Sequence, residues 1–463
     1  MPLPDPRTDP AGSTDTMHLS VVGTGYVGLV SALAFCHHGH HVTCVDIIPE
    51  RVDSISGGKA PFYEPGVAEA LAHHLGSGLL EATTDTARAV ADTEITFLCV
   101  GTPSSADGSY DLRHLAAAAR SVGEAIAGLD RHHVVVTKST VTPTANRSVV
   151  LPAIANASGK EAPAGFSLVS NPEFLREGSA LADALAPDRI VLGAMDGDRV
   201  ARDVLEGLYA PFDRPLLITS LEGAELIKLA SNSLLAIKVA FANEVANLAS
   251  SVDADGYQVL EGVGLDHRLG PHFLRAGAGF GGSCFPKDLR ALVAFSRSQG
   301  NPSLLPTAAL EQNEVQPTVM VELVRKALGG SLQGKRVALL GLAFKPDTDD
   351  VRETRALPIY RLLLEGGATV VCHDPRAGDN FVELVLEEGM AEPDVREGLD
   401  EVLREANVAV IQTEWEEYRQ LGPAQLVSEM APPRAIVDAR RTFDPYMMQA
   451  DGVIYWGVGL PPP

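Results

Sequence analysis

The sequence predicts an α/β protein in which two doubly wound domains are joined by a long central helix. The first observation is that short apolar runs alternate with helical stretches between residues 18 and 195, which is typical of a parallel sheet with helices on both faces. The second is a continuous stretch rich in Ala, Leu and Ile at about 220–252. The third is a new alternating block that begins at residue 334 and runs to the end of the chain.

The first block contains the apolar runs that are expected to form its parallel sheet. They lie at residues 18–23, 40–46, 95–100, 132–139, 166–171 and 189–195. A weak internal repeat relates the two blocks, because residues 33–46 and 362–375 both read as helix, glycine turn, strand and acidic residue at the strand tip. The predicted division is a disordered leader at 1–16, a first α/β domain at 17–212, a helical domain at 213–328 and a second α/β domain at 329–463.

Composition excludes several classes of function. The formal net charge is −23, so no basic surface is available for nucleic acid. No apolar run approaches the roughly 18 residues of a membrane span, and the Pro- and Asp-rich start does not read as a signal peptide. The five cysteines are scattered and lack CxxC pairs, which favours a reducing cytoplasm over disulfides or a bound metal.

The run Gly23-Thr24-Gly25-Tyr26-Val27-Gly28 follows the first strand and opens a helix near Leu29. In such a turn the first glycine permits the bend, the second lets the backbone approach a pyrophosphate, and the third lets the helix pack on the strand. Asp46 ends the next strand, where a carboxylate can accept both ribose hydroxyls and would repel a 2′-phosphate. The arrangement indicates a Rossmann-like domain that binds NAD in preference to NADP.

Polar residues stand at three later strand tips of the same block, at Thr102, Thr140 and Glu173. Ligands bind at the carboxyl ends of the strands in open α/β sheets. Threonine, serine and asparagine also favour helix caps and turns. Each tip taken alone is therefore compatible with a binding role or with a purely local one.

A glycine-rich turn at 279–282 delivers Cys284 to the start of a predicted helix, with Pro286 suited to the first helical turn. Helix N-terminal amides and the neighbouring Lys287 would stabilise a thiolate, which suits a nucleophile. The other four cysteines lie inside apolar strands or helices and are interpreted as small buried residues. Lys228 and Asn232 share a face of the long helix, although a lysine there is also compatible with a solvated side chain whose stem covers apolar surface.

Taken together, these residues resemble the UDP-glucose/GDP-mannose dehydrogenase family over about residues 17–459. The most specific matches are GFGGSCFPKD at 279–288, NPEFLREGSA at 171–180, AELIKLASN at 224–232 and GLAFKPDTDDVRET at 341–354. The first and the last of these are most similar to the bacterial UDP-glucose branch of the family. After Arg352 the chain reads ETRALPI, which departs from the commoner pattern.

The resemblance implies roles for individual residues. Cys284 would be the nucleophile, and the residues around the reacting carbon would be Lys228, Asn232, Asp288, Thr140, Glu173 and Glu177. NAD would be held by Gly23, Thr24, Gly25, Tyr26, Val27, Gly28, Asp46, Arg51, Thr102, Thr140, Glu177 and Arg352. The UDP-sugar would be held by Glu173, Phe174, Leu175, Lys228, Asn232, Arg268, Phe273, Gly281, Phe344, Lys345 and Arg441.

The implied reaction is a four-electron, NAD-dependent oxidation of the C6 alcohol of UDP-glucose to the carboxylate of UDP-glucuronate. An aldehyde carbon does not readily lose a hydride until a nucleophile has added to it, which explains why a dehydrogenase would need Cys284 for a thiohemiacetal and then a thioester. GDP-mannose and UDP-N-acetyl sugars stay open as substrates. The resemblance also implies a homodimer or larger homo-oligomer in which Arg268 reaches the substrate of the neighbouring subunit, and a helix apolar around much of its circumference needs such a cover.

Two other classes of function share part of this pattern. A two-electron dehydrogenase of the 6-phosphogluconate or 3-hydroxy acid type would have the first domain and a helical connector, but it would need neither Cys284 nor a second α/β domain. An NAD-sensing binding protein would bind NAD without turnover. The intact cysteine motif disfavours this third interpretation.

Overall fold

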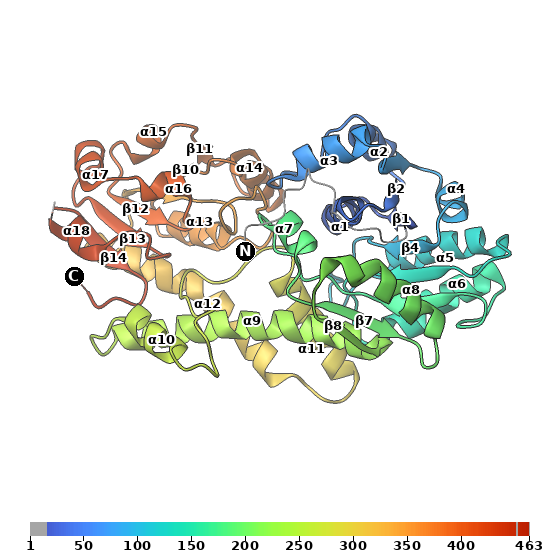
Figure 1. The fold of residues 1–463 in the computed structure, drawn as a ribbon. Helices are drawn as coiled ribbons and strands as arrows, with labels where there is room; N and C mark the ends of the chain where they lie inside the picture. Colours follow the sequence, from blue (N-terminus) through green and yellow to red (C-terminus); the bar gives the residue numbers. More distant parts are fainter. Residues whose placement is uncertain (1–15, 451, 463) are drawn as a thin grey trace. The chain divides into compact units, whose positions relative to one another are not determined.

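The computed structural model describes residues 16–450 and 452–462 (Figure 1). The predicted disordered leader, residues 1–16, therefore lies outside the described residues except for its last position. Over the residues that it describes, the chain folds as two compact units, divided after Ser231. Each unit contains one sheet with helices packed against it, which confirms the predicted fold class.

The first unit is built on a sheet with the strand order β3-β2-β1-β4-β5-β6-β7-β8. Its strands are β1 (His18–Val22), β2 (His41–Val45), β3 (Leu80–Thr83), β4 (Ile95–Leu98), β5 (Val134–Thr137), β6 (Ser167–Ser170), β7 (Ile190–Ala194) and β8 (Leu216–Ser220). Its helices are α1 (Tyr26–His37), α2 (Pro49–Ser56), α3 (Val67–Gly76), α4 (Thr86–Ala91), α5 (Arg113–Ala127), η1 (Asn146–Val150), α6 (Leu151–Ser158), α7 (Ala180–Leu185), α8 (Arg199–Tyr209) and η2 (Ala210–Phe212).

The expectation of a wholly parallel first sheet is wrong at one pairing. Strand β7 runs antiparallel to β6, while β8 pairs with β7 in parallel. Residues 171–189, which contain α7, connect β6 to β7. This connection is long enough for a parallel crossover, so its length does not explain the reversal. The short strands β3 and β8 were not among the expected strands, because neither contains a long apolar run.

The central strands of the first sheet are buried on both faces, and they show why these strands appear as continuous apolar runs in the sequence. In β5, Val134 and Val136 belong to one hydrophobic cluster, while Val135 belongs to the cluster on the opposite face. In β1, Val21 and Val22 divide between the same two clusters. Successive side chains of a strand point to opposite faces, so a sheet covered by helices on both sides needs apolar residues at nearly every position.

The second unit is built on a parallel sheet with the strand order β11-β10-β9-β12-β13-β14. Its strands are β9 (Arg336–Leu340), β10 (Thr369–His373), β11 (Asp394–Val395), β12 (Val408–Ile411), β13 (Ala435–Asp438) and β14 (Ile454–Gly457). Its helices are α10 (Gly256–Gly264), α11 (Phe285–Ser298), α12 (Leu304–Ala327), α13 (Ala356–Glu365), α14 (Gly378–Glu387), α15 (Leu399–Leu403), α16 (Glu416–Arg419), α17 (Pro423–Glu429) and α18 (Pro445–Ala450).

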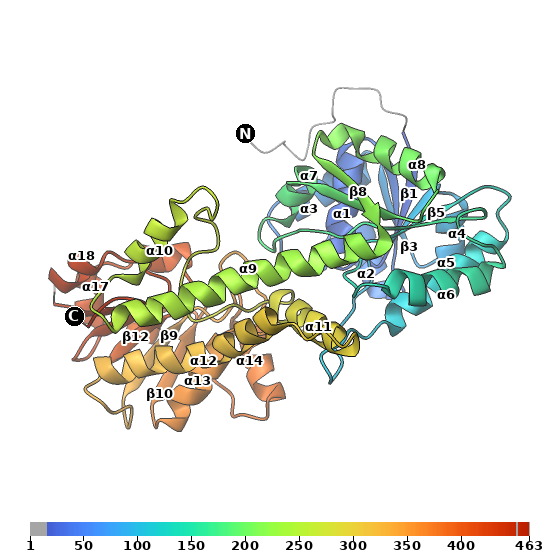
Figure 2. The ribbon, with the colours of Figure 1, turned by 90° about the horizontal axis from the view of Figure 1, so that it is seen from below.

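The predicted central helix is α9 (Leu221–Ser250), a single helix without interruption (Figure 2). The division between the two units falls within it. It is rich in alanine and leucine, which favour helix, and it contains no glycine or proline after Gly223. Across the described part of the chain, every helix is either too short or too polar to cross a membrane.

Candidate active site

The glycine turn between β1 and α1 has a different steric requirement at each glycine. Gly23 has φ +96°, which favours glycine, and its N–H donates to the Val45 carbonyl at 2.8 Å. A Cβ at Gly28 would lie 1.9 Å from the Gly23 oxygen, whereas a Cβ at Gly25 would have nothing within 4 Å. Helix α1 begins at Tyr26, not near Leu29 as expected. The open space at Gly25 therefore lies beside a helix N-terminus, where a pyrophosphate binds.

Asp46 lies at the tip of β2 and faces this turn. Its Oδ2 accepts hydrogen bonds from the Thr24 N–H at 2.9 Å and the Thr24 hydroxyl at 2.7 Å, and Oδ1 accepts the Ile48 N–H at 3.1 Å. Burial opposes ionisation, but these bonds and the guanidinium of Arg51, 3.6 Å away, lower the pKa of Asp46. Asp46 is thus an anion beside the open Gly25 position. The residues present fit an NAD pyrophosphate and ribose.

Glu64 was not identified from the sequence, yet it links the glycine turn to the segment just after Glu173. It is 5% exposed. Its carboxylate accepts from the Tyr26 hydroxyl and from the backbone N–H groups of Gly178 and Ala180, both at 2.7 Å. Burial and this carboxylate raise the pKa of Tyr26. A single acidic residue in a loop has no motif around it, so only the structure could identify it.

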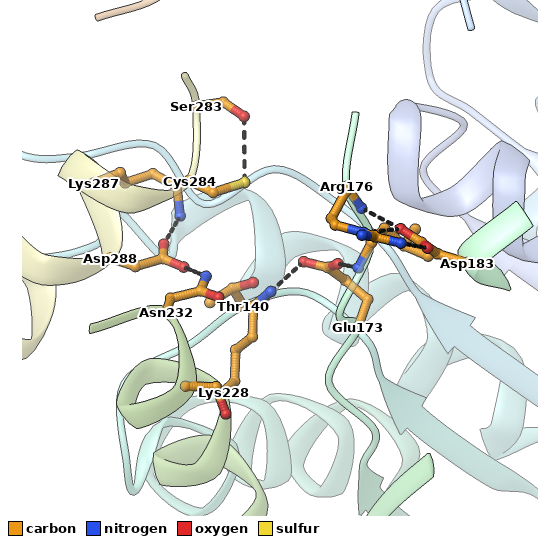
Figure 3. A network of polar contacts seen from close by, with 12 residues as sticks. Thr140, Glu173, Arg176, Asp183, Lys228, Asn232, Ser283, Cys284, Lys287 and Asp288 are labelled. Atoms are coloured by element: carbon orange, nitrogen blue, oxygen red, sulfur yellow. Dashed lines mark hydrogen bonds and ion pairs between the residues drawn. The ribbon is translucent and has the colours of Figure 1, made fainter. Parts of the chain in front are cut away.

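Glu173 and Lys228 form a buried ion pair in the first unit (Figure 3). The Lys228 ammonium donates to Glu173 Oε1 at 2.8 Å, and the Leu175 N–H donates to Oε2 at 2.6 Å. The two side chains are 3% and 7% exposed, so Lys228 is not the solvated lysine that the sequence left open. Lys228 Nζ also lies 5.5 Å from the ring centroid of Phe174.

Two predicted cofactor residues meet at neighbouring strand tips, because the Thr102 hydroxyl donates to the Thr140 carbonyl at 2.7 Å. Lys138, two residues before Thr140, was not predicted from the sequence. Its ammonium donates to Asn171 Oδ1 at 3.0 Å, and the Tyr209 hydroxyl donates to the same oxygen at 2.5 Å. Burial lowers the pKa of Lys138. Glu177, also predicted for this region, is half-buried.

In the second unit, Cys284 is the residue that precedes the first turn of α11. It is half-buried, whereas Cys36, Cys44, Cys99 and Cys372 are buried, as expected. The Ser283 hydroxyl lies 3.4 Å from the sulfur. Placement at a helix N-terminus stabilises a thiolate. The position of Cys284 is therefore the one that the sequence predicted for a nucleophile.

Asn232 on α9 contacts Asp288, which lies in the first turn of α11 (Figure 3). The Asn232 amide donates to Asp288 Oδ2 at 2.7 Å, and the Lys287 ammonium donates to Asp288 Oδ1 at 2.7 Å. Asp288 is 1% exposed. Both oxygens of the carboxylate thus have donors, and the side chain of Asn232 is held in one orientation.

Several of the residues predicted to hold the sugar nucleotide lie in the second unit, in different places. The ring of Phe344 lies against Gly282, where a Cβ would come within 2.7 Å of the ring, and Lys345 Nζ is 5.4 Å from the centroid of that ring. A Cβ at Gly281 would be 2.4 Å from the Glu353 oxygen. Phe273 is exposed and has φ +63°. Close packing at Gly281 and Gly282 explains why this loop is glycine-rich.

Three predicted arginines each pair with a nearby carboxylate. Arg268 pairs with Asp266 at 2.6 Å and Arg352 pairs with Asp350 at 2.6 Å, and both arginines are largely exposed. Arg441 is mostly buried; its guanidinium makes two 3.0 Å bonds to Asp255 and lies 4.7 Å from the ring centroid of Tyr257. A ligand that binds Arg441 must therefore share it with Asp255.

Comparison with known proteins extends over nearly the whole chain. The UDP-glucose/GDP-mannose dehydrogenase family is matched by its NAD binding domain at 17–213, its central domain at 222–315 and its UDP binding domain at 338–445. A UDP-glucose 6-dehydrogenase of Haloferax volcanii is 43% identical over 430 residues, which are 92% of this chain and 97% of the relative. One of Bacillus subtilis is 39% identical over 443 residues, which are 96% of this chain and 93% of the relative.

Solved structures agree with the sequence relatives. A UDP-glucose dehydrogenase from the archaeon Pyrobaculum islandicum has a TM-score of 0.88 and 43% identity, covering 98% of this chain and 100% of that one. A UDP-D-ManNAc dehydrogenase from Pyrococcus horikoshii has a TM-score of 0.82 and 27% identity, covering 96% and 99%. The first domain is the NAD-binding domain of such enzymes, and NAD is the cofactor. The chain belongs to the UDP-glucose/GDP-mannose dehydrogenase family.

Proposed function

We propose that this enzyme oxidises C6 of UDP-glucose to the carboxylate of UDP-glucuronate in two NAD-dependent steps, with Cys284 as the covalent nucleophile. The observation that carries the proposal is the position of Cys284, half-buried at the start of α11, while the other four cysteines are buried. A two-electron alcohol oxidation needs no nucleophile. The relatives named UDP-glucose 6-dehydrogenase support the choice of substrate.

Each covalent step balances on residues of this chain, while bound NAD supplies the acceptor for each hydride. Loss of the hydroxyl proton to a base and of a hydride from C6 gives the aldehyde. The Cys284 thiolate adds to the aldehyde carbon, a C–S bond forms, and the carbonyl electron pair moves to oxygen. Loss of the second hydride leaves a thioester. Water then adds to the thioester carbon and loses its protons. The C–S bond breaks, the Cys284 thiolate is released, and the carboxylate remains.

The remaining proposed roles are those that the family resemblance implies, and the chemistry of the side chains supports them. Lys228 and Asn232 would stabilise the oxygen anions that form at C6, since a lysine ammonium has three donors and can serve an oxyanion besides Glu173. Losing such a donor costs about 2.7–4 kcal/mol. Glu173 and Thr140 would position the hydrolytic water, and Asp288 would hold Asn232 toward the reacting oxygen.

The decisive experiment is a panel of nucleotide sugars with NAD, read by the absorbance of NADH. UDP-glucose should be the best substrate and should yield two NADH per molecule, while GDP-mannose and UDP-N-acetyl sugars should be poor. Cys284→Ala should still bind NAD but make no UDP-glucuronate in steady state. A yield of one NADH, or near-native turnover by Cys284→Ala, would contradict the covalent route. Preference for a UDP-N-acetyl sugar, the substrate class of the Pyrococcus relative, would change only the substrate.

We also propose a homodimer, or a larger assembly built from it, in which Arg268 serves the site of the neighbouring subunit. Leu234, Phe241 and Leu248 are 60%, 47% and 65% exposed, and their spacing of seven places them in one stripe along α9. An exposed apolar stripe of this kind indicates an interface. Arg268→Ala and Cys284→Ala should each be inactive, whereas a reassociated mixture should recover activity. If heterodimers form but stay inactive, Arg268 does not act in the site of the neighbouring subunit.

The domain boundaries and the location stay part of this proposal. The predicted division at 17–212, 213–328 and 329–463 lies close to the three matched family ranges. The predicted location is the cytoplasm, and the reduced, buried state of Cys36, Cys44, Cys99 and Cys372 is compatible with it. Fractionation of cells with an antibody to the chain tests the location.

A further inference from the structure

Residues 352–355 lie directly against the loop that carries Cys284. The Gly282 N–H donates to the Arg352 carbonyl at 3.0 Å. A Cβ at Gly281 would be 2.4 Å from the Glu353 oxygen, and one at Gly279 would be 3.1 Å from Arg355 Cδ. Residues 352–355 thus form the surface on which the nucleophile loop rests.

The side chains of this surface form a connected set of charges. The Glu353 carboxylate accepts from both terminal nitrogens of Arg290, at 2.6 and 3.1 Å, and Arg290 is on α11, the helix that begins after Cys284. Arg355 donates through Nε and Nη2 to the Glu353 carbonyl, at 3.3 and 3.2 Å, and through Nη1 to Glu314 at 3.3 Å. Glu353 therefore connects Arg355 to the cysteine helix.

Two properties distinguish this set from ordinary surface ion pairs. The Arg355 side chain is only 6% exposed, and a buried guanidinium is held in one geometry by its partners. Glu353 has φ +52°, a left-handed conformation that is unfavourable for a residue with a side chain. The two arginines bind opposite ends of that residue, its carboxylate and its carbonyl, and so stabilise the unfavourable backbone.

The other side of the loop is held by a neutral residue. Asn313 on α12 accepts from the Phe280 N–H at 2.7 Å and donates to the Phe280 carbonyl at 2.9 Å. Its side chain is 2% exposed. The nucleophile loop is therefore held between Asn313 and the charged set, and the charged set also reaches α11 through Arg290.

We infer that Arg355 and Glu353 are positioning residues that hold the nucleophile loop and, through Arg290, the start of α11, so that Cys284 stays at the helix N-terminus. The inference rests on the proposed function of Cys284. A bidentate arginine–carboxylate pair fixes orientation as well as distance. Small displacements of a reacting group cost large factors in rate, so the positioning acts on the covalent step and not on ligand binding.

The test compares Arg355→Met with a matched control, Arg361→Met. Methionine keeps an aliphatic side chain beside Gly279 and removes the guanidinium, and Arg361 makes an exposed pair with Glu388 in the same unit. The first measurement is the rate of alkylation by iodoacetamide without NAD or sugar nucleotide. It reports on Cys284 because the other four cysteines are buried. The second is kcat and KM with UDP-glucose and NAD.

Arg355→Met should alkylate roughly three- to fivefold more slowly, because Cys284 moves away from the helix N-terminus. Its kcat should fall about tenfold or more, with both KM values unchanged, and Arg355→Lys should recover part of both losses. Equal alkylation and kcat in Arg355→Met and Arg361→Met would overturn the inference, even if Arg355→Met melts earlier. If Arg355→Met does not fold, Arg290→Lys can be measured in the same two ways. Arg290 is partly exposed, and lysine keeps its charge but loses the two-pronged bond to the Glu353 carboxylate.

The two levels of the proposal can fail separately. If Cys284→Ala retains turnover, the nucleophile role is wrong, yet the alkylation rates still report whether Arg355 positions the cysteine. If Cys284→Ala is inactive and Arg355→Met behaves as its control, only the positioning role is wrong.

Discussion

The two units contain the same turn but use it differently. Gly23 has φ +96° and donates to the Val45 carbonyl at 2.8 Å, and Gly341 has φ +93° and donates to the His373 carbonyl at 2.9 Å. In both, an aspartate at the next strand tip accepts a backbone N–H of the turn: Asp46 from Thr24 at 2.9 Å and Asp374 from Leu342 at 2.7 Å. The glycine bend and the acidic strand tip are therefore a structural feature of the sheet, whatever ligand it binds.

The difference lies in where the next helix starts. In the first unit α1 begins at Tyr26, directly behind Gly25, whereas in the second unit α13 begins only at Ala356. Asp374 also accepts the Ala343 N–H and the indole N–H of Trp415, at 3.0 Å each. The feature that separates the two turns is therefore the helix that starts within the first one, since both aspartates accept several hydrogen bonds.

The largest expected effect is that of Gly25→Val on NAD binding. Gly25 has ordinary extended backbone angles and nothing lies within 4 Å of its Cβ position, so the fold should be retained while the side chain occupies the pyrophosphate space. We expect NAD affinity to fall by about a hundredfold or more, measured by calorimetry. Unchanged NAD binding would show that the turn at Gly23–Gly28 does not hold the pyrophosphate.

The matched variant in the second turn is Gly341→Ala. Its Cβ would lie 2.4 Å from Thr413 Cβ at φ +93°, so it should lower the free energy of unfolding by about 2–4 kcal/mol. NAD affinity of the folded protein should not change.

Substitution of the two aspartates should likewise affect NAD binding in the first unit and fold stability in the second, with smaller changes than the glycine variants give. Asp46→Ala should weaken NAD binding about tenfold and reduce the preference for NAD over NADP, because the carboxylate that would accept the ribose hydroxyls is lost. Asp374→Ala should leave the NAD dissociation constant unchanged and destabilise the fold by about 1.5–3 kcal/mol, because buried donors lose a charged acceptor. Calorimetry with both nucleotides and urea unfolding measure the pair. Weaker NAD binding in folded Asp374→Ala would contradict the division of roles.

The smallest expected effect is on acid stability. Burial, with nearby His37 and His40, lowers the pKa of His38 to about 4 in the first unit. The unfolded value is near 6.5, so the unfolded chain binds the extra proton first. This contribution to stability is complete above about pH 6.5 and is lost as the pH falls toward 4. In the second unit burial raises the pKa of Asp438, which has the opposite sign on acidification.

Calorimetric scans at pH 7 and pH 5 test this sign. His38→Leu should lose less of its melting temperature between the two pH values than the native protein, by roughly 2–4 °C. His114→Leu, at an exposed position, is the control and should behave as native. Equal losses in both variants would show that His38 is protonated equally in the folded and unfolded chains.

The sequence was sufficient for features that are local in the chain. The glycine turn, the long helix α9 and the placement of Cys284 before α11 each follow from adjacent residues. The antiparallel direction of β7 does not, because an apolar run has the same composition in either direction. The roles of Glu64 and Arg355 could not be predicted either, since the partners of Glu64 and the Glu314 partner of Arg355 are distant in the sequence, and a single charged residue gives no periodic signal.

The Glu173–Lys228 pair has a consequence for how mutants of this enzyme are interpreted. Both side chains are nearly inaccessible to solvent, so removing either one leaves an uncompensated charge in the interior, at a cost of about 3–5 kcal/mol. An inactive alanine variant at either position would therefore confound damage to the scaffold with loss of chemistry. Neutral isosteres such as Glu173→Gln and Lys228→Met, measured singly and together, separate the two. If the double variant folds as well as the native chain, its residual turnover is a clean measure of what the charges contribute to the reaction.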